Sequence, residues 1–462
     1  MNVEVLSRVQ FGATIAFHYL FPPLSIGLGL ILVIMEALWL RTKDEKYLLM
    51  TKFWTKIFGL IFAVGVASGI VMEFQFGTNW AAYSRFVGDV FGSALAAEGI
   101  FAFFLESGFL AIVLFGWQKV RAGTHFFATC MVCLGAHFSA VWIVVANSWQ
   151  QTPAGHHLVR HGAGFRAEIT DFWAMVFNPS SVDRLLHAIL GAYLAAAFMV
   201  LSVSAFYLLR GRHREIAVAS LRIGLVVAAI ASVLQLASGH SSARVVVRYQ
   251  PAKLAAFEGL FETREQAPLH PFGWVDERNR RVVGPAVPGA LSFLAYGDFN
   301  TRVTGLDAFG PDERPPVQAV FQFFHLMVAI GITLIGLSLL GVFFWWQGVL
   351  FAAKSRFVRF YLWALVLSVV LPQMANESGW FAAEMGRQPW VVYGLLRTAD
   401  GLSEAVSVQH LWFSLILFGL IYILLFALFI FLLDRKIRQG PVPEAAAETT
   451  VKRHMPFRTG EV

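Results

Sequence analysis

Apolar residues occur along the chain in nine long runs separated by polar segments. A helix needs about 20 predominantly apolar residues to cross the hydrocarbon core of a bilayer. Nine runs meet this requirement, at 12–40, 54–76, 93–116, 124–147, 186–209, 217–238, 318–346, 357–380 and 410–433. The pattern predicts an all-α integral membrane protein with nine transmembrane helices, in which the whole chain, 1–462, forms a single polytopic domain. We expect no β-sheet within the membrane, because a spanning segment must satisfy its own backbone hydrogen bonds.

Basic residues between the runs predict the orientation of the chain. Lysine and arginine gather in every second connection, as at Arg41 and Lys43 after the first run and at Lys119 and Arg121 after the third. Such an excess marks the cytoplasmic loops of membrane proteins. We therefore expect the N-terminus outside and the C-terminus in the cytoplasm. The long hydrophilic connection 239–317 then lies outside, where it is the expected site for an external partner.

The composition supports a membrane protein and removes other classes. Hydrophobic residues make up 57% of the chain and charged residues 14%, against about 25% charged residues in soluble proteins. The net charge is +7, but the basic residues lie in short clusters between apolar runs, so no nucleic-acid partner is expected. The only two cysteines, Cys130 and Cys133, lie in the middle of a run. They are expected to be small buried apolar residues rather than a metal or redox pair.

Ionisable side chains inside the runs are candidates for function, because they are costly in a membrane. They are His18, Glu73, Glu98, Glu106, His137, His187, His325, Glu377 and Glu384. The predicted orientation places most of them in a layer near the outer face. Such a set indicates proton handling or metal ligation. A lone histidine in a helix is more often a hydrogen-bonded core residue, which is the expectation for His137, His325 and His410.

Two local features add to this layer. Glu106 follows Glu98 by eight residues and therefore lies about 12 Å deeper in a helix, where it suits a proton path from the cytoplasm. An uninterrupted α-helix would place the two carboxylates on adjoining faces. In the first run, Pro22 has no N–H to donate to the carbonyl of His18. We expect the helix to kink or open there and to make room for a bulky group beside His18.

Four stretches resemble subunit I of the cytochrome bd-type quinol oxidases. They are LSRVQFGATIAFHYLFPPL (6–24), MTKFWTKIFGLIFAVGVASGIVMEFQFGTNW (50–80), GSALAAEGIFAFFLES (92–107) and GWFAAEMGRQPW (379–390). The motifs GRQPW and MEFQFGTNW are the most specific, and the resemblance covers nearly all nine runs. The connection 239–317 corresponds to the external quinol-binding loop of that family, in its short form.

The resemblance implies three haems and a set of site residues. His187 and Met327 match the axial ligands of a low-spin haem b. His18 and Glu384 match iron ligands of the two high-spin sites, which hold a haem b and a haem d in an order that the sequence does not decide. The resemblance assigns further residues to the proton route (Glu98, Glu106, Ser139), to haem binding (Arg8, Glu73, Trp380, Arg387) and to quinol (Lys253, Glu258). One departure is His325, where the family often has arginine.

The function implied by the resemblance is that of a terminal oxidase in the bacterial plasma membrane. Quinol would be oxidised at the outer face, and O₂ would be reduced to water with protons from the cytoplasm. The family implies a second multi-span subunit and, in some members, a small single-span subunit. One alternative is a haem-b quinol dehydrogenase without oxygen chemistry, which would leave His18 and Glu384 without a role. Another is a proton-coupled transporter, which would predict inverted repeats and broken helices at the midplane of the membrane, neither of which the sequence shows.

Overall fold

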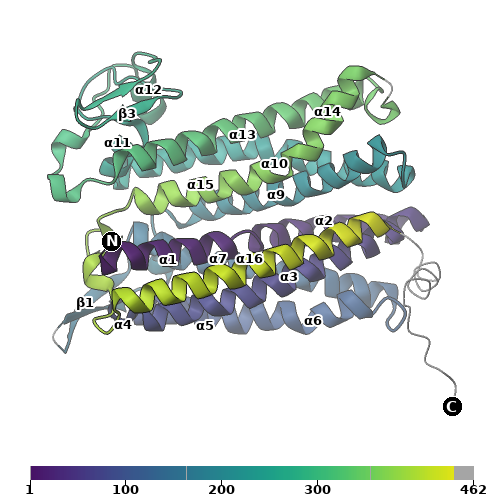
Figure 1. Ribbon diagram of the computed structural model, residues 1–462, viewed down its shortest axis with the longest axis horizontal. Helices are drawn as coiled ribbons and strands as arrows, with labels where there is room; N and C mark the ends of the chain where they lie inside the picture. Colours follow the sequence, from purple (N-terminus) through teal and green to yellow (C-terminus); the bar gives the residue numbers. More distant parts are fainter. Residues whose placement is uncertain (1, 163, 354, 442–462) are drawn as a thin grey trace.

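The computed structural model describes residues 2–441 except 163 and 354. Within that part of the chain, nine helical segments are long and apolar enough to span a membrane. They are Val3–Thr42, Glu45–Thr78, Gly88–Phe115, Ala122–Gln151, Ser181–Leu209, Arg214–Tyr249, Pro311–Trp346, Arg356–Met385 and Val408–Gln439. The segments lie side by side in one bundle (Figure 1). The nine predicted spans are therefore confirmed.

Several of these segments consist of more than one helix. The helices are α1 (Val3–His18), α2 (Pro22–Thr42), α3 (Glu45–Thr78), α4 (Ala81–Phe86), α5 (Gly88–Glu98), the π-helix η1 (Gly99–Phe103), α6 (Phe104–Phe115), α7 (Ala122–Gln151), α8 (Phe172–Val176), α9 (Ser181–Leu209), α10 (Arg214–Tyr249), α11 (Pro251–Glu258), α12 (Ala290–Tyr296), α13 (Val317–Trp346), α14 (Arg356–Leu367), α15 (Leu371–Met385) and α16 (Val408–Gln439). Short 3₁₀ turns are η2 (Leu306–Ala308), η3 (Pro311–Glu313), η4 (Leu350–Ala352), η5 (Ser368–Val370) and η6 (Ala399–Gly401).

In the described part of the chain, the strands form three antiparallel pairs. These are β1 (His156–His161) with β2 (Gly164–Ile169), β3 (Trp274–Asp276) with β4 (Arg281–Val283), and β5 (Trp390–Val392) with β6 (Leu396–Arg397). All three pairs lie in connections between the nine spanning segments, as predicted. The start of α1, the hairpin β1–β2 and the helices α11 and α12 gather at one end of the bundle (Figure 1).

The first span is broken beside His18, as the sequence predicts. α1 ends at His18, and Pro22 opens α2. Proline has no N–H, so the His18 carbonyl instead accepts a hydrogen bond from the N–H of Phe21 at 3.1 Å. The break leaves the His18 ring at the inner end of α1.

The third span differs from the prediction of an uninterrupted α-helix. The π-helix η1 separates Glu98 from Glu106. A π turn takes up roughly one extra residue, so the eight residues cover about two whole turns. Both carboxylate side chains consequently face α7, where Ser139 contacts Glu98 and Gly135 packs against Glu106. The prediction of adjoining faces was wrong for this reason.

The external connection after the sixth span is shorter than the predicted 239–317. α10 continues to Tyr249, eleven residues beyond the apolar run that ends at 238. The residues after 238 include polar and charged side chains that the apolar pattern could not count as helix. The connection also contains a helix of its own, α11, whose side chains are buried.

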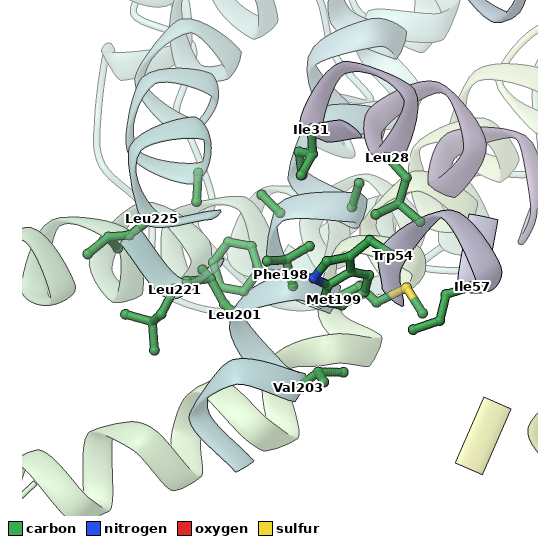
Figure 2. Close-up of a cluster of buried hydrophobic side chains, with 14 of the residues drawn as sticks. Leu28, Ile31, Trp54, Ile57, Phe198, Met199, Leu201, Val203, Leu221 and Leu225 are labelled. Atoms are coloured by element: carbon green, nitrogen blue, oxygen red, sulfur yellow. The ribbon is translucent and has the colours of Figure 1, made fainter. Parts of the chain in front are cut away.

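The core of the bundle is built around α9. In α9, 78% of the most apolar stretch is buried, whereas the value for α16 is 11%. Phe198, Leu201 and Val203 of α9 pack with Leu28 of α2 and Trp54 of α3 in the main hydrophobic cluster (Figure 2). α9 is therefore an interior helix, and α16 presents most of its side chains to the outside.

Candidate active site

One large cavity runs between the helices in the described part of the chain. Its volume is about 2030 Å³, about twice the upper end of the range for ordinary small-molecule pockets. Nearly all the predicted site residues line it. They are Arg8, His18, Glu73, Glu98, Glu106, Ser139, His187, Glu258, Met327, Trp380, Glu384 and Arg387. Lys253 alone of the predicted set does not line this cavity.

A serine of the next helix orients the His18 ring. Nδ1 of His18 lies 3.0 Å from the Ser68 hydroxyl. That hydroxyl has a single proton, which it donates to a backbone carbonyl oxygen of its own helix, Val64 at 3.0 Å or Gly65 at 2.9 Å. Its oxygen therefore accepts from Nδ1–H of His18. The lone pair of the imidazole then lies on Nε2, the nitrogen that would bind a metal.

His187 has the same arrangement on α9. Its Nδ1 lies 2.9 Å from the Ser238 hydroxyl, which donates to the carbonyl oxygen of Gln235 at 3.1 Å. Nε2 again carries the lone pair, and the Gln235 amide lies 3.2 Å from it. The Gln235 Oε1 atom is buried without a hydrogen-bond partner. This amide is therefore poorly anchored and could be displaced from Nε2 by a stronger ligand.

Three of the four candidate ligands, His18, His187 and Met327, each face a glycine on a neighbouring helix. A Cβ atom at Gly69 would lie 3.2 Å from the His18 ring, and one at Gly239 would lie 3.5 Å from the His187 ring. At Gly379, a Cβ atom would lie 2.6 Å from Sδ of Met327. Side chains at these positions would press on the ligand groups. The cavity and the donor set thus fit large planar groups held by imidazole, thioether and carboxylate ligands.

Glu384 is surrounded by donors at the C-terminal end of α15. Its Oε2 lies 2.5 Å from Nη2 of Arg387. Its Oε1 accepts from Asn147 and from Gln151, each at 3.1 Å. A second guanidinium, that of Arg184, lies 3.9 Å from Oε1. The carboxylate is therefore compensated by two cations although it is largely buried.

The sequence analysis missed four members of this polar cluster. They are Asn147, Gln150, Gln151 and Arg184. The amides lie at the polar end of span four, and Arg184 lies one turn before His187 in a stretch read as part of a connection. The three amides could have been recognised from the run ANSWQQ (146–151), which follows directly on an apolar segment. Amide side chains at such a helix end do not serve apolar packing and therefore indicate a polar site.

Lys253 is buried in the same cluster. Its side chain is 2% exposed, and its Nζ donates to the side-chain oxygens of Gln151 and Gln250. Burial, together with the nearby Arg184 guanidinium, holds the pKa of Lys253 well below its usual value. Gln151 also donates to Glu384, so it connects the lysine to the carboxylate.

Glu258 lies at the end of the same short helix but faces the cavity. It is 5% exposed, and its Oε2 has no hydrogen-bond partner. Burial raises the pKa of Glu258 to about 8. Lys253 and Glu258 point in different directions from α11, because five residues turn an α-helix through roughly 140° beyond one full turn. The structure therefore brings both residues to the same end of the bundle without pairing them.

The carboxylates of the third span lie between this cluster and the inner half of the bundle. Ser139 donates to Glu98 Oε1 at 2.8 Å. Glu106 is 7% exposed and packs against Gly135 of α7. Arg8, which also lines the cavity, is half-buried and lies 3.9 Å from Glu4.

Of the histidines expected to be hydrogen-bonded core residues, His137 and His325 are hydrogen-bonded and partly buried, whereas His410 is exposed, so the expectation was wrong for His410. Both ring nitrogens of His325 lie against backbone carbonyl oxygens, those of Phe321 at 2.9 Å and His270 at 2.7 Å. The His137 ring is hydrogen-bonded, and His410 is exposed. Cys130 and Cys133 are not disulfide-bonded. No group of three or more His, Cys, Asp or Glu side chains in residues 2–441, apart from 163 and 354, is arranged to hold a metal ion.

A helical membrane bundle around a large apolar cavity with imidazole, thioether and carboxylate groups defines a membrane protein built to bind large cofactors. The sequence model of the cytochrome bd terminal oxidase subunit I family matches residues 6–441, and the chain belongs to this family. The family and the nine spanning segments make it a multi-pass protein of the bacterial plasma membrane.

Curated relatives and a solved structure agree with this assignment. The chain is 40% identical to cytochrome bd ubiquinol oxidase subunit 1 of Bacillus subtilis, over 95% of the chain and 94% of the relative. It is 35% identical to cytochrome bd-II ubiquinol oxidase subunit 1 of Escherichia coli, over 95% and 97%. The fold is similar to that of the bd oxidase from Geobacillus thermodenitrificans, with a TM-score of 0.86 and 31% identity, over 95% of this chain and 99% of that one.

Proposed function

We propose that the chain is the subunit of a cytochrome bd-type terminal oxidase that oxidises quinol and reduces O₂. The overall reaction converts two quinols and one O₂ into two quinones and two waters. Membership of the family supports the reaction class, and the names of the relatives support quinol as the electron donor. The observation that carries the proposal is that one cavity contains His18, His187, Met327 and Glu384 together with protonatable carboxylates.

The four ligand residues would hold three haems. His187 and Met327 would bind a low-spin haem b, because an imidazole and a thioether fill both axial positions. His18 and Glu384 would each bind iron in one of two high-spin sites, which hold a haem b and a haem d. When bound, the haems supply electron transfer and the reduction of O₂. Arg8, Glu73, Trp380 and Arg387 line the same cavity and would contact the edges of these groups.

Quinol would be oxidised at the outer end of the bundle, beside α11. A quinol head group releases protons as it loses electrons, and it needs a donor and a proton acceptor within hydrogen-bond reach. Glu258 is suited to accept a proton because its carboxyl titrates near neutral pH. Lys253 would orient the head group through its Nζ, which already bonds two amides.

Protons for water formation would come from the cytoplasm, with the N-terminus of the chain outside. Glu106 lies deeper than Glu98 on the third span, and Ser139 fixes the Glu98 carboxylate. The three residues would carry protons toward the oxygen-reducing site. Because protons would be released on the outer side and taken up from the cytoplasm, the reaction would be electrogenic.

The complete oxidase would contain a second multi-span subunit, as the family implies, and in some assemblies a small single-span subunit. An absorption spectrum of the purified complex tests the cofactor content. We expect the reduced protein to show haem b bands together with a long-wavelength chlorin band from haem d. A spectrum of haem b alone would instead favour a quinol dehydrogenase.

A further inference from the structure

A second set of buried ionisable residues lies away from the cavity, between α2 and α7. Glu36 of α2 is 0% exposed, His125 is 1% exposed and Thr129 is 3% exposed. Nδ1 of His125 lies 2.7 Å from Glu36 Oε1, and the Thr129 hydroxyl donates to Glu36 Oε2 at 2.6 Å. None of the three lines the large cavity, and the proposed oxidase reaction uses none of them.

The hydrogen-bond geometry allows Glu36 and His125 to share one proton. Nε2 of His125 lies 3.2 Å from the carbonyl oxygen of Val113, which can only accept, so Nε2 carries a proton. One further proton then lies between Nδ1 and Glu36 Oε1. It can reside on either atom, because both arrangements keep the pair neutral. A pair of this kind can take up one proton and pass on another.

The cluster lies near the end of the bundle that is expected to face the cytoplasm. Glu36 lies six residues before the end of α2, and His125 lies three residues after the start of α7, which are depths of about 9 and 5 Å. The Trp117 ring covers the His125 ring, with the ring centres 3.7 Å apart. Only a thin layer of protein therefore separates the pair from this end.

A polar stripe continues from the cluster along α7. His125, Thr129, Cys133 and His137 follow each other at four-residue spacing, which places them on one helix face. Gly29 of α2 packs against Cys133 on this face. Each step is about one helical turn, a gap that a single buried water with polar neighbours can bridge.

The stripe ends at a hydrogen-bonded pair beside the cavity. Nδ1 of His137 donates to the Cys133 carbonyl oxygen at 2.7 Å, so Nε2 accepts from the Tyr193 hydroxyl at 2.8 Å. Tyr193 is on α9, and its neighbours Ala192 and Leu194 line the cavity. Glu106 lies against Gly135 on another face of α7, so the stripe is separate from the Glu98–Glu106 route.

We propose that Glu36, His125 and Thr129 form the cytoplasmic entry of a second proton route, which runs along α7 past Cys133 to the His137–Tyr193 pair. Neither residue of this pair lines the cavity, but the residues next to them in sequence, Ala136, Ala192 and Leu194, do. A purely structural clamp would gain little from an ionisable pair, because apolar packing holds helices together in a membrane without the cost of burying such groups. The inference rests on the proposed uptake of protons from the cytoplasm.

The activity test compares oxygen consumption by haem-loaded complexes. Glu106→Gln blocks the first route, and we expect a residual turnover that the second route supports. Adding Tyr193→Phe or Glu36→Gln should lower this residual turnover about 100-fold, which is the usual contribution of a positioned proton carrier. Adding Tyr422→Phe should not, because Tyr422 is a buried tyrosine of α16 away from the stripe. Equal rates in Glu106→Gln with and without Tyr193→Phe, or no residual turnover in Glu106→Gln, overturn the proposal.

An infrared measurement tests the entry independently of oxidase activity. The bands of the Glu36–His125 pair, from the Glu36 carboxyl and the His125 ring, are identified as those that Glu36→Gln removes or shifts, and they are followed after transfer to D₂O. The proposal predicts exchange within minutes, because the pair is connected to the cytoplasm. A band that does not exchange contradicts the proposal and indicates that the cluster is purely structural and closed to solvent. If the parent complex consumes no oxygen, the proposed function is wrong. The exchange measurement alone then tests whether Glu36 is connected to the cytoplasm.

Discussion

Lys253 and Glu384 are connected through a single side chain, that of Gln151. The amide oxygen of Gln151 accepts a hydrogen bond from the Lys253 Nζ, and its nitrogen donates to Glu384 Oε1 at 3.1 Å. The residue proposed to orient quinol and a residue proposed to bind iron are thus two hydrogen bonds apart. In the proposed arrangement, the electron donor and acceptor sites therefore lie next to each other.

Lys253→Met tests the quinol side of this connection. The substitution keeps the length of the stem but removes the donor from a buried site. We expect quinol turnover to fall about 10- to 100-fold, because the amides and the head group lose a hydrogen-bond donor. Steady-state kinetics with a soluble quinol measure this effect. The exposed Arg264 of the same connection provides the control, as Arg264→Met; parental turnover in Lys253→Met would place the quinol site elsewhere.

The pH dependence of quinol oxidation depends on Glu258. Burial raises its pKa to about 8, so the carboxyl is protonated at neutral pH and becomes a base as the pH rises through about 8. Quinol turnover should rise over the same range, and Glu258→Gln should lack this rise. Glu262→Gln, at an exposed position of the same connection, should keep it. A parental pH profile in Glu258→Gln would remove the residue from the reaction.

The same pKa makes a prediction for stability. The folded carboxyl keeps its proton up to about pH 8, whereas the free carboxyl loses it near 4.5. The unfolded state then binds fewer protons, so the free energy of unfolding falls as the pH rises between these values. Thermal unfolding of Glu258→Gln across this range should show a smaller slope than the parent. Identical slopes would contradict the raised pKa.

Met327→Leu tests the low-spin haem site. The two side chains have similar volumes, so the free energy of unfolding should change by less than about 1.5 kcal/mol. Loss of the thioether should change the spin state or the midpoint potential of that haem, which redox titration with optical spectra measures. Met374→Leu, on the exposed side of α15, is the matched control. Unchanged spectra and an unchanged midpoint potential in Met327→Leu would rule out Met327 as a haem ligand.

Glu106→Gln tests proton delivery. The amide keeps the shape of the side chain but removes the titratable proton, so oxygen consumption should slow strongly while the haem spectra stay intact. Glu98→Gln should in addition disturb the high-spin haems, because Glu98 lies beside them in the proposed arrangement. Proton uptake by vesicles, followed with oxygen consumption, measures the effect. Normal uptake in Glu106→Gln would show that the residue is only a packed, protonated carboxyl.

Much of the fold could be predicted from the sequence, because crossing a bilayer imposes a length and a composition on each helix. The break after His18 was also predictable, since Pro22 removes a definite hydrogen bond. The π-helix at Gly99–Phe103 was not, because no residue in GIFAF marks an extra residue in the turn. The continuation of α10 to Tyr249 was not predicted, because the helix extends past the end of the apolar run into polar sequence.

The residues of the candidate site could be predicted where an ionisable side chain lies in or beside an apolar span, because burying it in a membrane is energetically costly. His18, His187 and Glu384 stood out in apolar runs, and the structure brings them to one cavity. Arg184 did not stand out, because it lies at a span end where arginine is ordinary. Its contact with Glu384 comes from the packing of α9 beside α15, which no local pattern encodes.

The central claim is that electrons from quinol reach O₂ within this one chain and its haems. Quinol is added to the purified complex in a sealed oxygen electrode, and oxygen loss is recorded together with quinone formation. The account predicts the consumption of one O₂ for every two quinols oxidised, as the balance of the reaction requires. Rapid reduction of the haems by quinol without any loss of oxygen would contradict it.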